Sequence, residues 1–107
     1  MTTAKFLFSG DTIVSFELSG HSGAGEEGTD VVCSAVSSAA YMAANTIIEI
    51  LKLTPETEVR DGYLKLKMNL SDALKSKVIT DGLYLHLSEL QGQYPNNLKL
   101  ERGVFNA

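Results

Sequence analysis

The sequence predicts a single α+β domain, residues 1–107, with two helices packed on one mainly antiparallel sheet in the order β-β-α-β-β-α-β. Three observations predict this class. Several short stretches alternate apolar and polar residues, which is the period of a half-buried strand. Gly-Asp or Asp-Gly pairs separate neighbouring stretches, as in tight hairpins. Two longer segments are rich in apolar residues at helical spacing, and helices on one sheet are an economical packing.

The first predicted hairpin joins a strand at Lys5 to Phe8 with a strand at Thr12 to Leu18. In the second strand, Val14, Phe16 and Leu18 alternate with polar residues. Gly10-Asp11 supplies the turn between the strands.

A glycine-rich segment, Gly20 to Thr29, leads into a predicted helix from Val31 to Leu53. Asp30 is a suitable N-cap for this helix, because its carboxylate can accept from the free amides of the first turn. Thr54-Pro55 ends the helix, since a residue before proline is pushed out of the helical region. Polar residues interrupt the apolar run, which favours a buried helix over a membrane span.

The second half of the chain predicts another hairpin, a helix and a last strand. The hairpin has a type I′ turn at Asp61-Gly62. After the turn, residues 64, 66, 68 and 70 are apolar and should face the core. The predicted segments are Glu56 to Arg60, Tyr63 to Leu70, a helix from Ser71 to about Gln93, and a short strand around Leu98 and Leu100.

Composition excludes several classes of protein. One cysteine cannot form an internal disulfide, and with two histidines it is short of ligands for a structural zinc site, so we expect neither metal nor cofactor. The net charge of −4 argues against direct nucleic-acid binding, which needs a basic face. We see no signal peptide and no membrane span, so a cytoplasmic location is expected.

The single cysteine, Cys33, and one of the histidines, His21, flank the glycine-rich segment. If Asp30 caps the helix, Cys33 is its third residue, close to the positive end of the helix dipole and to free amides. Both features favour a thiolate. His21 could fold back to act as its base, and the amides of the first turn could hold an oxyanion.

Spacing alone leaves other interpretations open. A cysteine on an apolar helix is often a buried core residue, and a histidine at a strand end is often a plain surface residue. The chain could then be a non-catalytic peptide-binding module. Other chemistries fit less well: a tyrosine phosphatase needs an arginine where Ala39 stands, and a thiol redox enzyme needs a second cysteine. A phosphate loop lacks its Gly-Lys-Ser/Thr ending.

The run Gly20-His21, Gly28 and Asp30-Val31-Val32-Cys33 resembles the ribosomal-processing cysteine proteases, the Prp family, including the spacing from histidine to cysteine. The resemblance implies a homodimeric endopeptidase that removes an N-terminal extension from a ribosomal large-subunit precursor protein. It assigns Cys33 as nucleophile and His21 as base. It places the family's aspartate at Asp30, which we expect to cap the helix first and orient His21 second. Gly20 and Gly28 match the family's glycines and are expected to shape the loop.

The remaining candidates are charged or titratable residues near the motif. Glu26 and Glu27 are expected to lie on a solvated loop, and the functional hypothesis is that they attract basic residues of the substrate. His86 is expected to be a partly buried structural residue of the second helix. The cleavage-site residues and the dimer interface are not predicted by the sequence.

Overall fold

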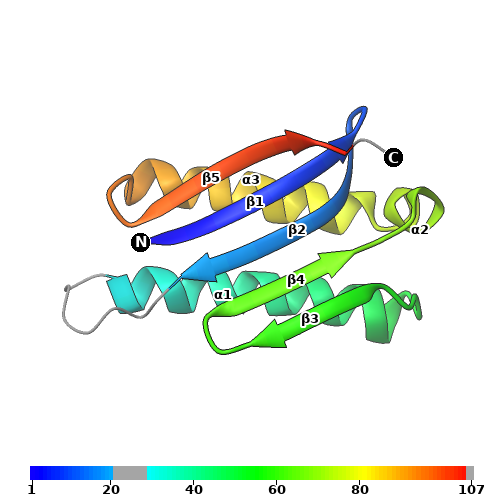
Figure 1. Cartoon of the computed structure of the whole chain (residues 1–107), viewed down its shortest axis with the longest axis horizontal. Helices are drawn as coiled ribbons and strands as arrows, with labels where there is room; N and C mark the ends of the chain where they lie inside the picture. The colour runs from blue at the N-terminus through cyan, green and yellow to red at the C-terminus, as the bar shows by residue number, and fades with distance from the viewer. Residues whose placement is uncertain (21–28, 106–107) are drawn as a thin grey trace.

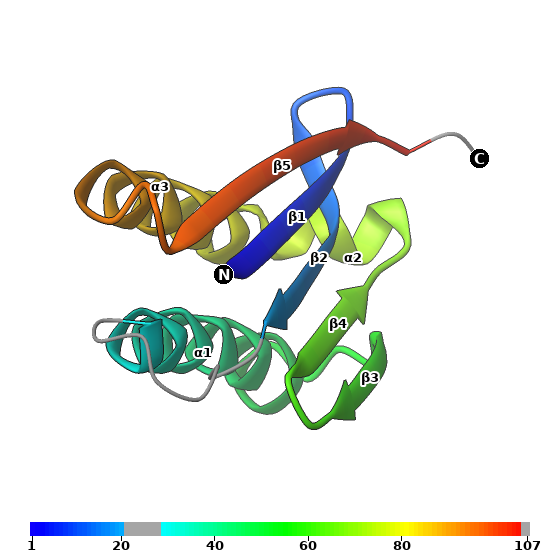
Figure 2. The same ribbon diagram turned by 60° about the vertical axis from the view of Figure 1, so that its left-hand side comes forward.

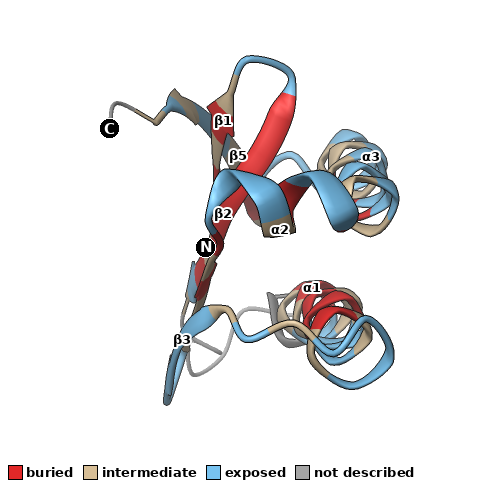
Figure 3. Cartoon of the chain, turned by 90° about the vertical axis from the view of Figure 1, so that its right-hand side faces the viewer, coloured by how far each residue is buried: buried red, intermediate tan, exposed pale blue. Residues whose placement is uncertain are grey.

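A five-stranded sheet forms one layer of the computed structural model, and the helices cover one of its two faces (Figures 1 and 3). The structure describes residues 1–20 and 29–105, and for Thr29 and Asp30 it describes the backbone alone. The strand order is β3-β4-β2-β1-β5, and only β1 and β5 are parallel neighbours. The strands are β1 (Thr2–Ser9), β2 (Thr12–Gly20), β3 (Glu56–Arg60), β4 (Tyr63–Lys67) and β5 (Leu98–Val104). The predicted α+β class and element order are therefore confirmed.

The first helical segment is α1 (Thr29–Asn45), continued by a π-helical turn, η1 (Thr46–Ile50). In this turn the amide of Leu51 donates to the carbonyl of Thr46 at 2.9 Å. The segment ends before Leu53, the predicted last residue, because Lys52 adopts a left-handed conformation with φ of 58°. By length and composition the stretch Val31–Ile50 could cross a membrane, but here it is the helix that packs on the sheet.

The second helical region is two helices, α2 (Leu70–Lys75) and α3 (Lys77–Gln93), where one helix was predicted. They meet at Ser76, whose ψ of 2° departs from helical geometry. The side chain of Asn69 caps α2 by accepting from the amide of Asp72 at 2.8 Å. The prediction that Leu70 faces the core was wrong, because this residue begins α2 and is 50% exposed.

The hydrophobic core lies between the helix-covered face of the sheet and the inner faces of α1 and α3. Phe6 and Phe16 are fully buried on neighbouring central strands, and their rings lie 6.2 Å apart. Tyr84 of α3 packs edge-on against Phe6 at 5.0 Å. The buried residues of α1 include Val36, Ala40 and Ala43; the two alanines let this helix approach the sheet closely.

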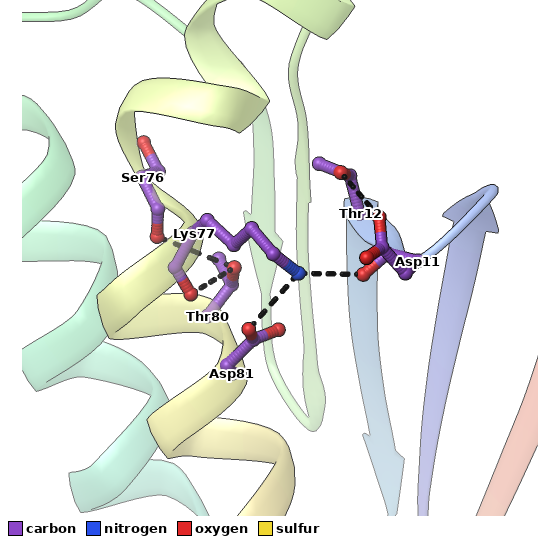
Figure 4. A network of polar contacts seen from close by, with 6 residues as sticks. All are labelled: Asp11, Thr12, Ser76, Lys77, Thr80 and Asp81. Atoms are coloured by element: carbon purple, nitrogen blue, oxygen red, sulfur yellow. Dashed lines mark hydrogen bonds and ion pairs between the residues drawn. The ribbon is translucent and has the colours of Figure 1, made fainter.

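A polar cluster ties the start of α3 to the β1–β2 turn (Figure 4). The ammonium of Lys77 donates to the backbone carbonyl of Asp11 at 2.7 Å and pairs with Asp81 at 3.1 Å. The hydroxyl of Thr80 donates to the carbonyls of Ser76 and Lys77, each at 3.3 Å. This cluster fixes the end of the molecule opposite the first turn of α1.

The face of the sheet without helices carries a row of alternating charges, one on each strand. Strand register places Glu101, Lys5, Glu17, Lys65 and Glu58 side by side across β5, β1, β2, β4 and β3. Opposite charges on neighbouring strands attract one another. This row keeps the open face polar and helps to specify the strand register.

Three segments meet at one end of the sheet (Figures 1 and 2). They are the last residues of β2, the first turns of α1 and the turn between β3 and β4. The two described parts of the predicted catalytic motif, Gly20 and the segment from Thr29 to Cys33, therefore lie at this end.

Candidate active site

Cys33 lies on α1, in a half-buried position. Its thiol is therefore neither sealed in the core nor fully in solvent. Because α1 begins at Thr29, Asp30 lies inside the first turn and Cys33 is the fifth residue of the helix. The expectation that Asp30 precedes the helix and that Cys33 is its third residue was wrong. The free amides of the first turn thus lie one turn before Cys33.

The flank of α1 that carries Cys33 borders a small cleft. Ser37 and Tyr41 follow Cys33 at four-residue spacing, so the three side chains form a row along the helix. The cleft has a volume of about 80 Å³, and its other lining residues come from the ends of β1, β2, β3 and β4 and from the β3–β4 turn. It is the described cavity that contains the cysteine, and its opposite walls come from residues distant in sequence.

Two glycines set the close packing beside this cleft. The amide of Gly20 donates to the carbonyl of Gly62 at 3.1 Å. A Cβ at Gly62 would lie 2.7 Å from the Gly20 carbonyl oxygen, and a Cβ at Gly20 would lie 2.9 Å from the Cα of Thr2. Both positions therefore need glycine, and Gly20 holds the chain in place immediately before His21.

The turn at Asp61-Gly62 differs from the predicted type. A type I′ turn needs positive φ at both central residues, but only Gly62, with φ of 70°, has it. The turn still joins Arg60 to Tyr63 as a two-residue loop. It brings the backbone of Gly62 against the end of β2.

Thr2 is one of the lining residues of the cleft and carries a buried hydroxyl. Thr2 is only 3% exposed, and its Oγ1 has no hydrogen-bond partner among the described residues. This oxygen lies beside Gly20, 3.0 Å from the point where a Cβ would be.

Arg60 and Tyr63, the pair next to the β3–β4 turn, also line the cleft. The guanidinium carbon of Arg60 lies 3.8 Å from the centre of the Tyr63 ring, and the same group pairs with Glu58. Loss of hydration raises the pKa of the Tyr63 hydroxyl, and so do its hydrogen bond to Glu17 and the negative charge of that carboxylate, while Arg60 lowers it. The cation and the aromatic ring are therefore held together on the open face of the sheet, next to Glu17 and Glu58.

The family model for the cysteine protease Prp matches residues 1–99. The chain belongs to the Prp family of cysteine proteases. A Bacillus subtilis (strain 168) protein named ribosomal processing cysteine protease Prp is 26% identical over 98 residues, which cover 86% of this chain and 88% of that protein.

Solved structures share the Prp fold. An essential ribosomal processing protease Prp from S. aureus, in complex with a substrate peptide, superposes with a TM-score of 0.85 at 20% identity. The alignment covers 95% of this chain and 99% of that one. SMU.848 from Streptococcus mutans gives a TM-score of 0.86 at 24% identity, covering 98% and 99% of the two chains.

Several predicted site residues lie outside the described part of the chain: His21 and Gly28 of the Prp motif, the candidate steering residues Glu26 and Glu27, and the side chain of Asp30. Their roles stay predictions. Within residues 1–20 and 29–105, no cluster of three or more histidine, cysteine or acidic side chains could hold a metal ion. His86 is exposed on α3, so the expectation that it is partly buried was wrong. It lines a groove between α3 and α1 whose lining does not include Cys33.

Sequence reasoning found only Gly20 and Cys33 among the residues that line the Prp cleft. Ser37 and Tyr41 could have been found from their four-residue spacing after Cys33. Arg60 and Tyr63 carry no such signal, because they reach the cleft only when β4 pairs with β2.

Proposed function

We propose that this protein is a cysteine endopeptidase that removes the N-terminal extension of a ribosomal large-subunit protein, with Cys33 as nucleophile and His21 as general base. The observation that carries the proposal is the half-buried thiol of Cys33 at a cleft, in a chain that belongs to the Prp family. The relative from Bacillus subtilis, named as a ribosomal processing protease, supports the substrate class.

In the proposed reaction, His21 takes the proton of the Cys33 thiol, and the sulfur attacks the carbonyl carbon of the scissile peptide bond. The carbonyl oxygen becomes an oxyanion, which backbone amides at the start of α1 stabilise. When the C–N bond breaks, the leaving amine takes the proton from His21, and an acyl-enzyme thioester remains. Water, deprotonated by His21, then releases the acid product and the thiolate. Asp30 supports the first turn and the orientation of His21, and Gly28 shapes the loop with Gly20.

The direct test is incubation of the protein with the extended ribosomal precursor, followed by mass measurement of the products. We expect Cys33→Ala and Cys33→Ser to abolish cleavage while the circular dichroism spectrum stays unchanged. The matched control is Ser34→Ala, at the next, exposed position of α1, which should cleave like the wild type. Cleavage by Cys33→Ala would refute the assignment of the nucleophile.

Alkylation separates the protease from a non-catalytic peptide-binding module. An activated thiolate reacts with iodoacetamide much faster than an ordinary protein thiol at neutral pH. Slow alkylation of Cys33, together with peptide binding and no cleavage, would favour the binding module.

The acidic residues Glu26 and Glu27 are proposed to attract basic residues of the ribosomal substrate. Such steering weakens as salt rises, because counterions screen the charges. We expect the double variant Glu26→Gln, Glu27→Gln to lower kcat/KM at low salt and to flatten its salt dependence. An unchanged salt dependence would contradict this role.

A homodimer in the cytoplasm completes the proposal. The described α1 carries no charged residue from Val31 to Asn45, and Met42 on its outer face is 53% exposed. A groove of about 630 Å³ lies between α1 and α3, lined by Ala35, Ala39, Gly82 and neighbouring side chains. Uncharged surface of this kind is typical of subunit interfaces. Met42→Glu should give monomers in light scattering, whereas Val104→Glu on β5 should not, and a monomeric wild type would refute the dimer.

A further inference from the structure

Strand β3 is an edge strand with one side open. It pairs with β4 on one side, and it is the first strand in the order β3-β4-β2-β1-β5. All five of its residues are exposed. Among the described residues, no backbone hydrogen bond joins its outer side to another segment. An open edge of this kind can accept a further strand.

The β3–β4 hairpin defines which backbone groups point outward. Its loop has two residues, so Arg60 and Tyr63 form a hydrogen-bonded pair next to the loop. Hydrogen-bonded residues alternate along an antiparallel strand. The N–H and C=O groups of Thr57 and Val59 therefore point away from β4. These residues offer the spacing that an added strand needs.

The two sides of this edge differ in chemistry. Val59 lies opposite the buried Leu64, so its side chain is on the helix-covered side of the sheet, and it is 57% exposed. Glu56 and Glu58 lie opposite Lys67 and Lys65, on the open side. An added strand would therefore meet apolar surface on one side and carboxylates on the other.

The edge is continuous with the cleft that holds Cys33. Arg60 is the last residue of β3 and also lines that cleft. Tyr41, on the same flank of α1 as Cys33, lines the cleft and is 45% exposed. A chain that leaves the cleft along β3 passes between this edge and the flank of α1.

We propose that the substrate peptide binds as an added strand along β3, with backbone hydrogen bonds to Thr57 and Val59. Alternate side chains of the peptide pack toward Val59 and Tyr41, and the intervening ones face Glu56 and Glu58. The substrate segment is thus an extended peptide that alternates apolar with polar or basic residues. This inference rests on the proposed protease function. It uses the general mode in which peptides extend a sheet edge, where the backbone supplies affinity and alternate side chains supply specificity.

The first test uses the wild-type protein and a series of substrate peptides, each with one backbone amide N-methylated. N-methylation removes a donor. Strand addition therefore predicts that methylation at every second position of the peptide raises KM by about ten-fold, because the hydrogen bond is lost and the methyl group clashes with β3. Methylation at intervening positions should change KM by less than about two-fold. A pattern without period two, or no effect on the residues beyond the scissile bond, would overturn the proposal.

The second test places proline at the edge. Val59→Pro removes one outward N–H without removing a bond to β4, and proline is tolerated on edge strands. The matched control is Val104→Pro on β5, the opposite edge. Val104 is 73% exposed, and its N–H also points outward, because the next amide, that of Phe105, donates to Phe8. We expect Val59→Pro to raise KM by about ten-fold with little change in kcat, and Val104→Pro to change neither.

The outcomes separate this inference from the proposed function. If the wild type does not cleave the precursor, the protease function fails. If the wild type cleaves the precursor but Val59→Pro has the same kinetics as Val104→Pro, strand addition along β3 is refuted and the protease function is retained. A change of molecular mass in Val59→Pro, with KM unchanged, would show that a second copy occupies the edge and would also overturn the proposal. If Val59→Pro does not fold, the N-methylated peptides still decide.

Discussion

Replacing Gly62 by alanine tests whether close packing at the β3–β4 turn positions the catalytic segment. Gly62 has φ of 70°, and a Cβ there would lie 2.7 Å from the carbonyl oxygen of Gly20. Gly20 immediately precedes the proposed base, His21. In Gly62→Ala, either the backbone of the β3–β4 turn or the end of β2 must therefore shift to relieve this contact.

Gly10 provides the matched control for this change. It has φ of 63° in the β1–β2 turn, and a Cβ there would meet no atom within 4 Å. Alanine at Gly10 would therefore meet no steric clash. Its only cost is that a residue with a Cβ must adopt the left-handed conformation, which is about 1 kcal/mol. Alanine at Gly62 adds overpacking against backbone, which costs about 1–3 kcal/mol more.

Urea unfolding and peptide cleavage measure the two effects separately. We expect Gly10→Ala to lower the free energy of unfolding by about 1 kcal/mol and to leave kcat/KM unchanged. Gly62→Ala should lose about 2–4 kcal/mol and reduce kcat/KM by at least about ten-fold under conditions where it is folded. Equal losses of stability in the two variants, with full activity in Gly62→Ala, would refute the reasoning.

Two further predictions concern Glu17, at the centre of the charge row on the open face. Glu17→Lys replaces attraction to Lys5 and Lys65 on the neighbouring strands by repulsion, so the free energy of unfolding should fall by about 1–3 kcal/mol in low salt and by less in high salt. A loss that salt does not reduce would show that the effect is not electrostatic. Glu17→Gln should lower the pKa of Tyr63, because it removes the charge and weakens the hydrogen bond that raise it. Absorbance titration at 295 nm, compared with the same titration of Tyr63→Phe, checks this shift, and an unchanged pKa would contradict it. The raised pKa favours the folded state below the ordinary tyrosine value of about 10, and this small contribution is lost as the pH rises through the folded value.

The strands and the first hairpin were predictable because they depend on alternation among adjacent residues. Phe16 and Leu18 alternate with polar neighbours, and both are buried as predicted. The break at Ser76 was not predictable, since no glycine or proline occurs between Ser71 and Asp81 to mark it. Leu70 followed the alternation of β4 but became the first residue of a helix, because Asn69 supplied a cap.

The catalytic motif could be predicted only as a pattern. The spacing of His21, Asp30 and Cys33 indicated the family, and the match over residues 1–99 confirmed that assignment. Cys33 was predicted to be the third residue of its helix and is the fifth. The start of a helix depends on which of its first amides find partners outside the helix, and local sequence does not settle this.

The sequence by itself determined the class of fold, the family and the single thiol, since periodicity and motif spacing involve residues close together in the chain. Tertiary structure alone decided what faces that thiol. Thr2, Gly62 and Arg60 are brought to Cys33 by strand pairing across the sheet. Such contacts depend on which strands become neighbours, and that is set by burial of the whole core and not by any local pattern.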